Sequence, residues 1–148
     1  MKHKWLFILL LFNLVLSAQS TKINDQTRYF SDSRLFYVWN DEKQIYDLRD
    51  TEFENSLIDI REIGSKNNGY IIISLVDNGD VRTYHGSIVS HNVDENGMSN
   101  WVLRSKNARG KLAFDAVKKS FTYSYESNEK RYVKIFVFSL RPEDEGKK

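Results

Sequence analysis

A chain of 148 residues is long enough for one domain, and the absence of cysteine excludes disulfides, thiolate metal sites and an acylated-cysteine lipoprotein anchor. The formal net charge is +2, and it falls to zero when Lys2 and Lys4 are removed with the N-terminal segment described next. A mature chain without disulfides depends on its core for stability, and its many aromatic residues can supply the buried area.

The first 18 residues have the pattern of a secretory signal peptide. Lys2 and Lys4 precede an apolar run from Trp5 to Leu16, and Leu16-Ser17-Ala18 ends in small residues. The run is too short to span a membrane comfortably, so an uncleaved anchor is the less favoured interpretation. We expect export by this leader, a mature chain that starts at Gln19, and a final location in the periplasm or outside the cell.

The chain up to the central hairpin predicts one loose segment followed by three strands. Residues 19–33 are polar without a regular period, which favours a loose segment with at most a short strand at Tyr29-Phe30. Residues 50–55 contain Thr51-x-x-Glu54, a pattern that can cap a single helical turn. Apolar, β-branched and aromatic residues predict the three strands at 35–40, 44–49 and 57–63.

Residues 69–91 contain the strongest local signal, a β-hairpin. Two runs rich in β-branched residues flank Asn78-Gly79, a pair that accepts positive φ at both positions of a type I′ turn. This loop places Ile73 opposite Tyr84 and Ile72 opposite His85. The first run is apolar on both faces, which predicts a central strand. Gly86, inside the second run, predicts a bulge, a bend or a large side chain over the backbone.

The rest of the chain predicts four further strands and a disordered polar tail. Residues 91–100 are polar and favour a long loop. Phe121, Tyr123 and Tyr125 alternate with polar residues, as on a strand with one solvated face. Residues 141–148 contain the single proline and no apolar residue, which indicates disorder. The predicted strands cover residues 101–105, 111–114, 121–126 and 132–140.

The whole pattern predicts an all-β fold. About eight to nine short strands with turn signals between them form a single-domain antiparallel meander over residues 34–140. A strongly twisted meander tends to close, because open strand edges promote aggregation. The sequence therefore favours a small closed or partly open barrel, with a β-sandwich as the alternative.

The sequence contains no motif for catalysis or metal binding. His85 and His91 share the parity of one predicted strand and would lie about 20 Å apart, too far for one metal ion. We expect His85 to lie beside Ile72 and His91 to lie in a loop. The acidic residues between Asp41 and Glu54 indicate a solvated surface, and the serines lack a Gly-x-Ser-x-Gly context. The sequence favours a protein that is not an enzyme and that uses no cofactor or metal.

Charge is divided unevenly along the chain. Residues 19–100 carry eight basic and 14 acidic side chains, whereas residues 101–140 carry nine basic and three acidic ones. Either strands from the two halves alternate in space and the charges mix, or the molecule has a basic patch for an acidic partner. Basic and aromatic residues interleave between Lys118 and Lys134, as on some nucleic-acid-binding barrels. A secretory leader separates the chain from most nucleic acid, so we predict no nucleic-acid partner.

Two hypotheses for the function follow. The first is an exported binding protein with a small apolar or amphipathic ligand in the barrel, which resembles calycin-type carriers in fold alone. Val38-Trp39 lacks the preceding glycine of the Gly-x-Trp lipocalin signature. The second is a cell-envelope protein-interaction or inhibitor protein, with a filled core and an exposed patch. The candidate ligand-lining residues, chosen as large residues on predicted strands, are Tyr70, Ile72, Tyr84, Trp101, Phe114, Tyr123 and Phe136.

Overall fold

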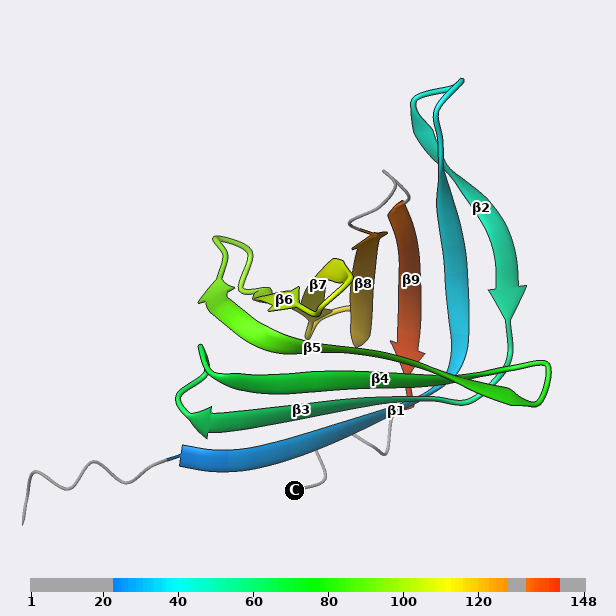
Figure 1. The fold of residues 1–148 in the computed structure, drawn as a ribbon. Helices are drawn as coiled ribbons and strands as arrows, with labels where there is room; N and C mark the ends of the chain where they lie inside the picture. The colour runs from blue at the N-terminus through cyan, green and yellow to red at the C-terminus, as the bar shows by residue number, and fades with distance from the viewer. Residues whose placement is uncertain (1–22, 128–132, 142–148) are drawn as a thin grey trace, which may run out of the picture.

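The computed structural model describes residues 23–127 and 133–141, and the predicted leader (residues 1–18) and residues 142–148 of the predicted tail lie outside them. Nine strands follow one another in the described part of the chain (Figure 1). Their bounds are β1 Ile23–Asn40, β2 Ile45–Glu52, β3 Ser56–Gly64, β4 Gly69–Asp77, β5 Asp80–Val93, β6 Ser99–Arg104, β7 Ala108–Asp115, β8 Ser120–Ser127 and β9 Val133–Leu140.

The strands form one antiparallel sheet that closes on itself. They pair in the order β2-β1-β3-β4-β5-β6-β7-β8-β9, and β1 pairs in addition with β9. Eight strands therefore form a barrel, and β2 pairs with β1 outside it. The predicted all-β meander is confirmed, and it closes as a barrel. Closure satisfies the strand edges that an open meander would expose.

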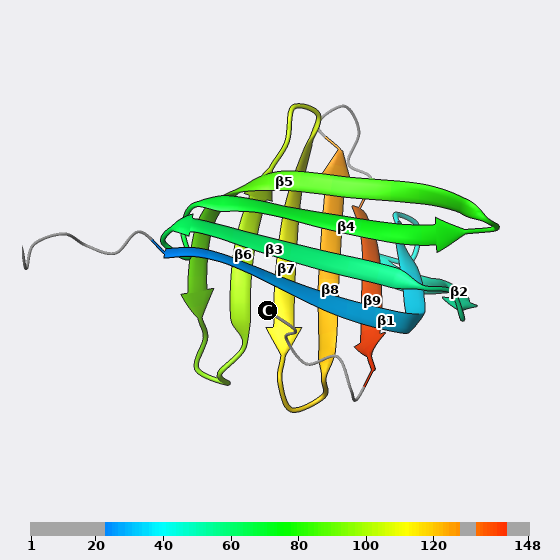
Figure 2. The same cartoon turned by 90° about the horizontal axis from the view of Figure 1, so that it is seen from below.

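The barrel is built from two layers that cross each other. Figure 2 shows β3, β4, the start of β1 and the first half of β5 crossing over β6, β7, β8 and β9. We call these groups the first layer and the second layer. Consecutive strands are neighbours, so the two halves of the sequence do not alternate in space. The acidic N-terminal part supplies most of the first layer, and the basic C-terminal part supplies most of the second.

β1 is long because it serves both layers. Residues 23–31 pair with β3, residues 31–38 pair with β9, and residues 34–40 pair with β2, with an irregularity between Ser31 and Ser33. The interpretation of residues 19–33 as loose is therefore wrong from Ile23 onward. These residues are polar, but their backbone groups bond to a partner strand about 30 residues away, and long-range pairing outweighs local composition.

The central hairpin has the predicted register. Ile73 pairs with Tyr84, Ile72 with His85, and Asp77 with Asp80. Asn78 and Gly79 both have positive φ, at 51° and 86°, as a type I′ turn requires. The turn chemistry alone was sufficient to fix this pairing.

Three local expectations differ from the structure. β2 extends to Glu52, so residues 50–52 are strand instead of a capped helical turn. β5 extends to Val93, so His91 is a strand residue and the following loop is short. The β5–β6 pairing shifts between Ile88 and Ser90, which inserts Val89 as an extra residue. This β-bulge reverses the alternation of faces, so His85 points outward and His91 inward.

Side chains fill the interior where the two layers face each other. Phe121, Phe138, Ile58 and Ile71 are fully buried, and each such side chain contributes about 1.5–3 kcal/mol to stability. Both layers contribute to one continuous cluster of buried residues: Ile58, Ile60, Ile71, Ile73, Leu75, Ile88, Trp101, Leu103, Leu112, Phe121, Tyr123, Phe136 and Phe138.

A buried arginine lies where β2 leaves the barrel. Arg34 is 1% exposed, forms an ion pair with Glu52 of β2, and donates to Ser56 Oγ of β3 at 3.0 Å. It also donates to the carbonyl oxygen of Val76 in β4. A buried charge must be paired and hydrogen-bonded, and these partners lie on three strands. Arg34 therefore holds the bent β1–β2 hairpin against the first layer.

A candidate binding groove on the outer face

The structure divides the seven candidate ligand-lining residues between the two faces of the barrel. Tyr70 and Ile72 alternate with the buried Ile71 and Ile73, so they lie on the outer face of β4. Tyr70 contacts Arg61 there, with the guanidinium 6.0 Å from the ring centroid. The inward residues are Tyr84, Trp101, Phe114, Tyr123 and Phe136.

Aromatic side chains occupy the lumen near Tyr84. The Tyr84 ring lies 5.6 Å from Tyr123, 5.3 Å from Tyr125 and 5.6 Å from Phe136, measured between centroids. Burial, followed by the neighbouring Tyr84 and Tyr125, raises the pKa of Tyr123. Tyr123 also lies against Gly110, where an added Cβ would meet its ring at 2.9 Å. The inward aromatic residues therefore pack on one another, and the hollows described next open on the outer surface.

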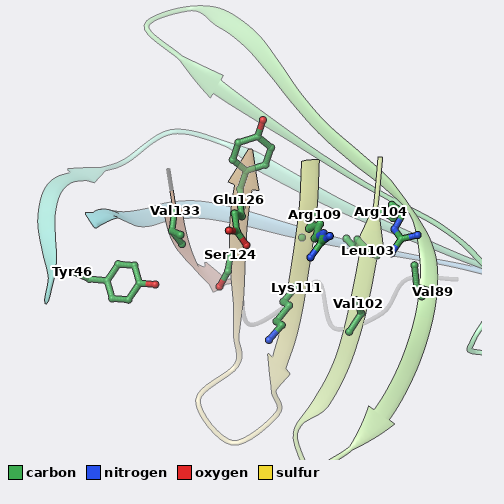
Figure 3. A pocket seen from close by; sticks show the side chains of 12 residues that line it. Tyr46, Val89, Val102, Leu103, Arg104, Arg109, Lys111, Ser124, Glu126 and Val133 are labelled. Carbon is green, nitrogen blue, oxygen red and sulfur yellow. The ribbon is translucent and has the colours of Figure 1, made fainter. Parts of the chain in front are cut away.

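The largest of these hollows lies on the outer face of the second layer and is about 580 Å³ in volume. We call it the outer groove. Strand alternation creates its floor: Trp101, Leu103 and Leu112 point inward, so the residues between them point outward. Figure 3 shows these outward side chains between Tyr46 on one side and Val89 on the other. The outward residues of the groove include Val102, Arg104, Arg109, Lys111, Ser124, Glu126 and Val133.

Two irregular features of the sheet form the sides of the groove: β2, which lies outside the barrel, and the bulge in β5. Tyr46 comes from β2, outside the barrel, and its ring contacts Trp39 edge-on with centroids 5.0 Å apart. Val89 is the extra residue of the β5 bulge. With Val102 and Val133 they make the groove partly apolar. A smaller hollow of about 290 Å³ shares Tyr46, Glu126 and Val133 and extends the groove toward the β1–β2 turn.

Three basic side chains give the groove its charge. Arg104 pairs in register with Arg109, and Lys111 lies one outward position further along β7. Glu126, opposite Arg109 on β8, is the acidic residue of the groove. The three basic side chains form no hydrogen bond or ion pair with another described residue. Adjacent like charges repel, so their positions favour an anion between them.

Two arginines of the first layer have carboxylate partners. Arg28 Nε lies 3.1 Å from Asp59 Oδ2, and Arg82 Nη2 lies 2.7 Å from Asp77 Oδ2. A hollow of about 400 Å³ on the outer face of this layer is lined by Phe30, Leu57 and Val81 among others. Its one basic residue, Arg141, donates to Asn55 and lies 3.8 Å from Asp32. Of these hollows, the outer groove therefore combines an apolar wall with basic groups that form no ion pair with a described residue.

The inward cation and the histidines lie away from the groove. Lys134 is half-buried beside Tyr125 and Val38, and burial, with Arg82 nearby, lowers its pKa. The inward His91 contacts Trp101, with ring centroids 4.9 Å apart, and burial, followed by the Lys66 charge, lowers its pKa.

In residues 23–127 and 133–141 no three His, Asp or Glu side chains gather as metal ligands. The same residues contain no helix of the length and apolarity needed to cross a membrane.

Sequence reasoning did not select any residue of the outer groove. The excess of basic residues after residue 100 was the available signal, and Arg104, Arg109 and Lys111 belong to that excess. Their convergence with Tyr46 required the position of β2, which the sequence pattern does not specify.

Comparison of the chain with protein-family models, curated proteins and solved structures finds no match.

Proposed function

We propose that this protein is an exported, non-enzymatic binding protein whose outer groove holds a small amphipathic anion. The single observation that carries the proposal is the set of three unpaired basic side chains beside apolar walls in one hollow. A volume of about 580 Å³ lies within the 300–1,000 Å³ typical of small-molecule sites. The fold is compatible with that of calycin-type carriers, but here the ligand lies outside the barrel, because aromatic side chains pack the lumen.

The chemistry of the groove defines the ligand class. Tyr46, Val102 and Val133 bury an acyl or ring system, and Arg109 and Lys111 bind a carboxylate or phosphate at its end. The guanidinium of Arg109 can form two parallel hydrogen bonds with such a head group. Export by the leader would place this site in the periplasm or outside the cell.

Calorimetric titration with decanoate and decanol tests the proposal. These probes share an apolar chain and differ in charge, so the parent protein should bind decanoate more tightly. The double variant Arg109→Gln/Lys111→Gln should lose roughly tenfold or more in decanoate affinity, since a hydrogen bond to a charged group contributes about 1.5–3 kcal/mol. Arg28→Gln, on the outer face of the first layer, is the matched control and should bind as the parent does.

Unchanged decanoate affinity in the double variant would contradict the proposed site. A native mass spectrum of the protein purified from its own host adds an independent test. An extra mass that disappears on denaturation supports a carrier, and its value indicates the ligand class. The measured mass of the polypeptide also shows whether the chain begins at Gln19.

A second candidate function is protein interaction in the cell envelope. The observation that favours it is the group of exposed apolar side chains on and after β2. Ile45 is 50% exposed, Leu48 is 52% exposed and Phe53 is 81% exposed. Exposed apolar residues gathered in one region indicate contact with another macromolecule.

A further inference from the structure

We propose that β2 pairs with β2 of a second copy of this chain, in an antiparallel register centred on Leu48. β2 is the last strand in the sheet order, and among the described residues its far edge has no partner strand. Figure 1 shows β2 at the side of the barrel, next to β1. An edge of this kind presents backbone donors and acceptors to any strand that can approach.

The side chains of β2 resemble a contact surface more than a solvated edge. β2 has eight residues, of which Ile45, Tyr46 and Leu48 are apolar and at least 42% exposed. Edge strands are commonly protected by short length, charged side chains or bulges; β2 has charged residues and a bulge but no lysine, and its apolar residues stay exposed beside the charges. Other strands also expose apolar residues, such as Val81 and Val93 of β5, but β5 pairs with a neighbour along each edge, whereas β2 pairs along one edge among the described residues. An added strand would cover the exposed apolar residues of β2.

Charge complementarity identifies the partner as a second copy. In an antiparallel pair centred on Leu48, Leu48 lies opposite its own copy, and Asp47 lies opposite Arg49 of the other chain. Two-fold symmetry forms this ion pair twice. A shift that pairs Leu48 with Arg49 would set Asp47 against Asp50, and like charges directly opposite are unfavourable. The strand sequence Ile-Tyr-Asp-Leu-Arg is therefore complementary to itself in the Leu48 register.

Asp47 and Arg49 are charged and at least partly exposed, as the ion pair between the two copies requires. Asn40 donates a 2.7 Å hydrogen bond to Asp47, which lowers the pKa of this carboxyl and keeps it charged. Lys43 lies 3.8 Å from the same carboxylate, and the residue retains partial exposure. Arg49 is exposed, and it is the residue that the β1–β2 pairing passes over at a β-bulge. The bulge limits the flat part of the edge, so the pairing is short and the dimer weak.

Exchange of the two charges tests the proposal on the full mature chain by sedimentation equilibrium across a concentration series. The parent should dimerise. Asp47→Arg and Arg49→Asp should each raise the dissociation constant roughly tenfold or more, because each substitution creates two like-charge pairs. A mixture of the two variants should form heterodimers, because the two arginines of one chain then face the two aspartates of the other. A change in the fold of a single chain cannot produce this recovery.

Arg49→Glu provides a second variant in case Asp47→Arg disturbs the hairpin through loss of the Asn40 hydrogen bond. Arg49 makes no hydrogen bond or ion pair with a described side chain of its own chain, although its charge helps to lower the pKa of Asp47, so this variant should weaken the dimer with little effect on the hairpin. A parent that remains monomeric at the highest concentration would overturn the proposal and leave the edge to a different protein. Dimerisation of Arg49→Glu at the parent affinity, or a mixture that fails to associate, would also overturn it.

Discussion

The two layers of the barrel have the same strand architecture but use their basic side chains differently. In the first layer, Arg28 pairs with Asp59 and Arg82 pairs with Asp77 across neighbouring strands. In the second layer, Arg104, Arg109 and Lys111 lie together on the outer face and form no ion pair with a described residue, although Glu126 is in the same groove. Neighbouring carboxylates therefore neutralise Arg28 and Arg82 in the first layer, whereas the second layer presents its three basic side chains in a hollow. This difference indicates which face of the barrel is used for binding.

The largest effect should come from the ion pair of Arg34, which holds the β1–β2 hairpin against the first layer. Arg34→Ala leaves the partly buried Glu52 without its cation and the buried Ser56 without a donor. Removal of one member of a buried ion pair costs about 3–5 kcal/mol. Arg28→Ala, which removes an arginine from a surface pair, should cost less than about 1 kcal/mol. Urea denaturation measures both values, and similar losses would mean that Arg34 does not hold the β1–β2 hairpin in place.

Two glycines provide the next comparison. Gly79 has a φ of 86° at the tip of the first layer, and Gly86 lies where β5 passes toward the second. Gly79→Val should cost about 2–3 kcal/mol, because a β-branched residue is strained at positive φ. Gly86→Ala should cost about 1 kcal/mol, because the added Cβ would meet Leu103 Cβ at 3.0 Å and require a small shift. Equal or reversed losses in denaturant midpoint would contradict this order.

The turn at Asn78-Gly79 and the bulge at Val89 show how far the sequence could predict the fold. Asn78-Gly79 determines its turn through local backbone conformation, so the register of the whole hairpin followed from two residues. The bulge at Val89 has no such local signal, since it results from the passage of β5 between the layers. The expectation that His85 and His91 share a face was wrong for this reason.

The candidate site shows the same limit. Tyr70 and Ile72 were grouped with Tyr84 by size alone, although the predicted register already places Ile72 and Tyr84 on opposite faces. The outer groove combines β2, the β5 bulge and the outer positions of β6 to β8. Its basic residues were visible as a charge excess after residue 100, but their location on one face depends on which strands become neighbours.

A smaller effect should distinguish paired from unpaired basic residues. Arg82→Gln removes a cross-strand ion pair with Asp77 and should cost up to about 1 kcal/mol in low salt. Arg109→Gln removes both the repulsion from Arg104 and the attraction of Glu126 on the opposite strand, so stability should stay nearly unchanged. The difference should shrink in about 1 M salt, because the Debye length falls to about 3 Å. Equal losses for the two variants in thermal denaturation would mean that Arg109 has a stabilising partner.

The smallest effect concerns the two histidines on either side of the β5 bulge. His85 points outward in the first layer, whereas His91 is half-buried against Trp101, where burial and the Lys66 charge lower its pKa below 6.5. Since the unfolded chain then binds a proton before the folded chain does, stability is complete above about pH 6.5 and falls as pH decreases toward the folded-state pKa. Chemical denaturation between pH 7.5 and 5 should show this loss in the parent and in His85→Gln. The Glu62 charge opposes the lowering of the His91 pKa, so the effect is modest. In His91→Gln the free energy of unfolding should depend less on pH. An unchanged pH dependence would mean that His91 is not the titrating group.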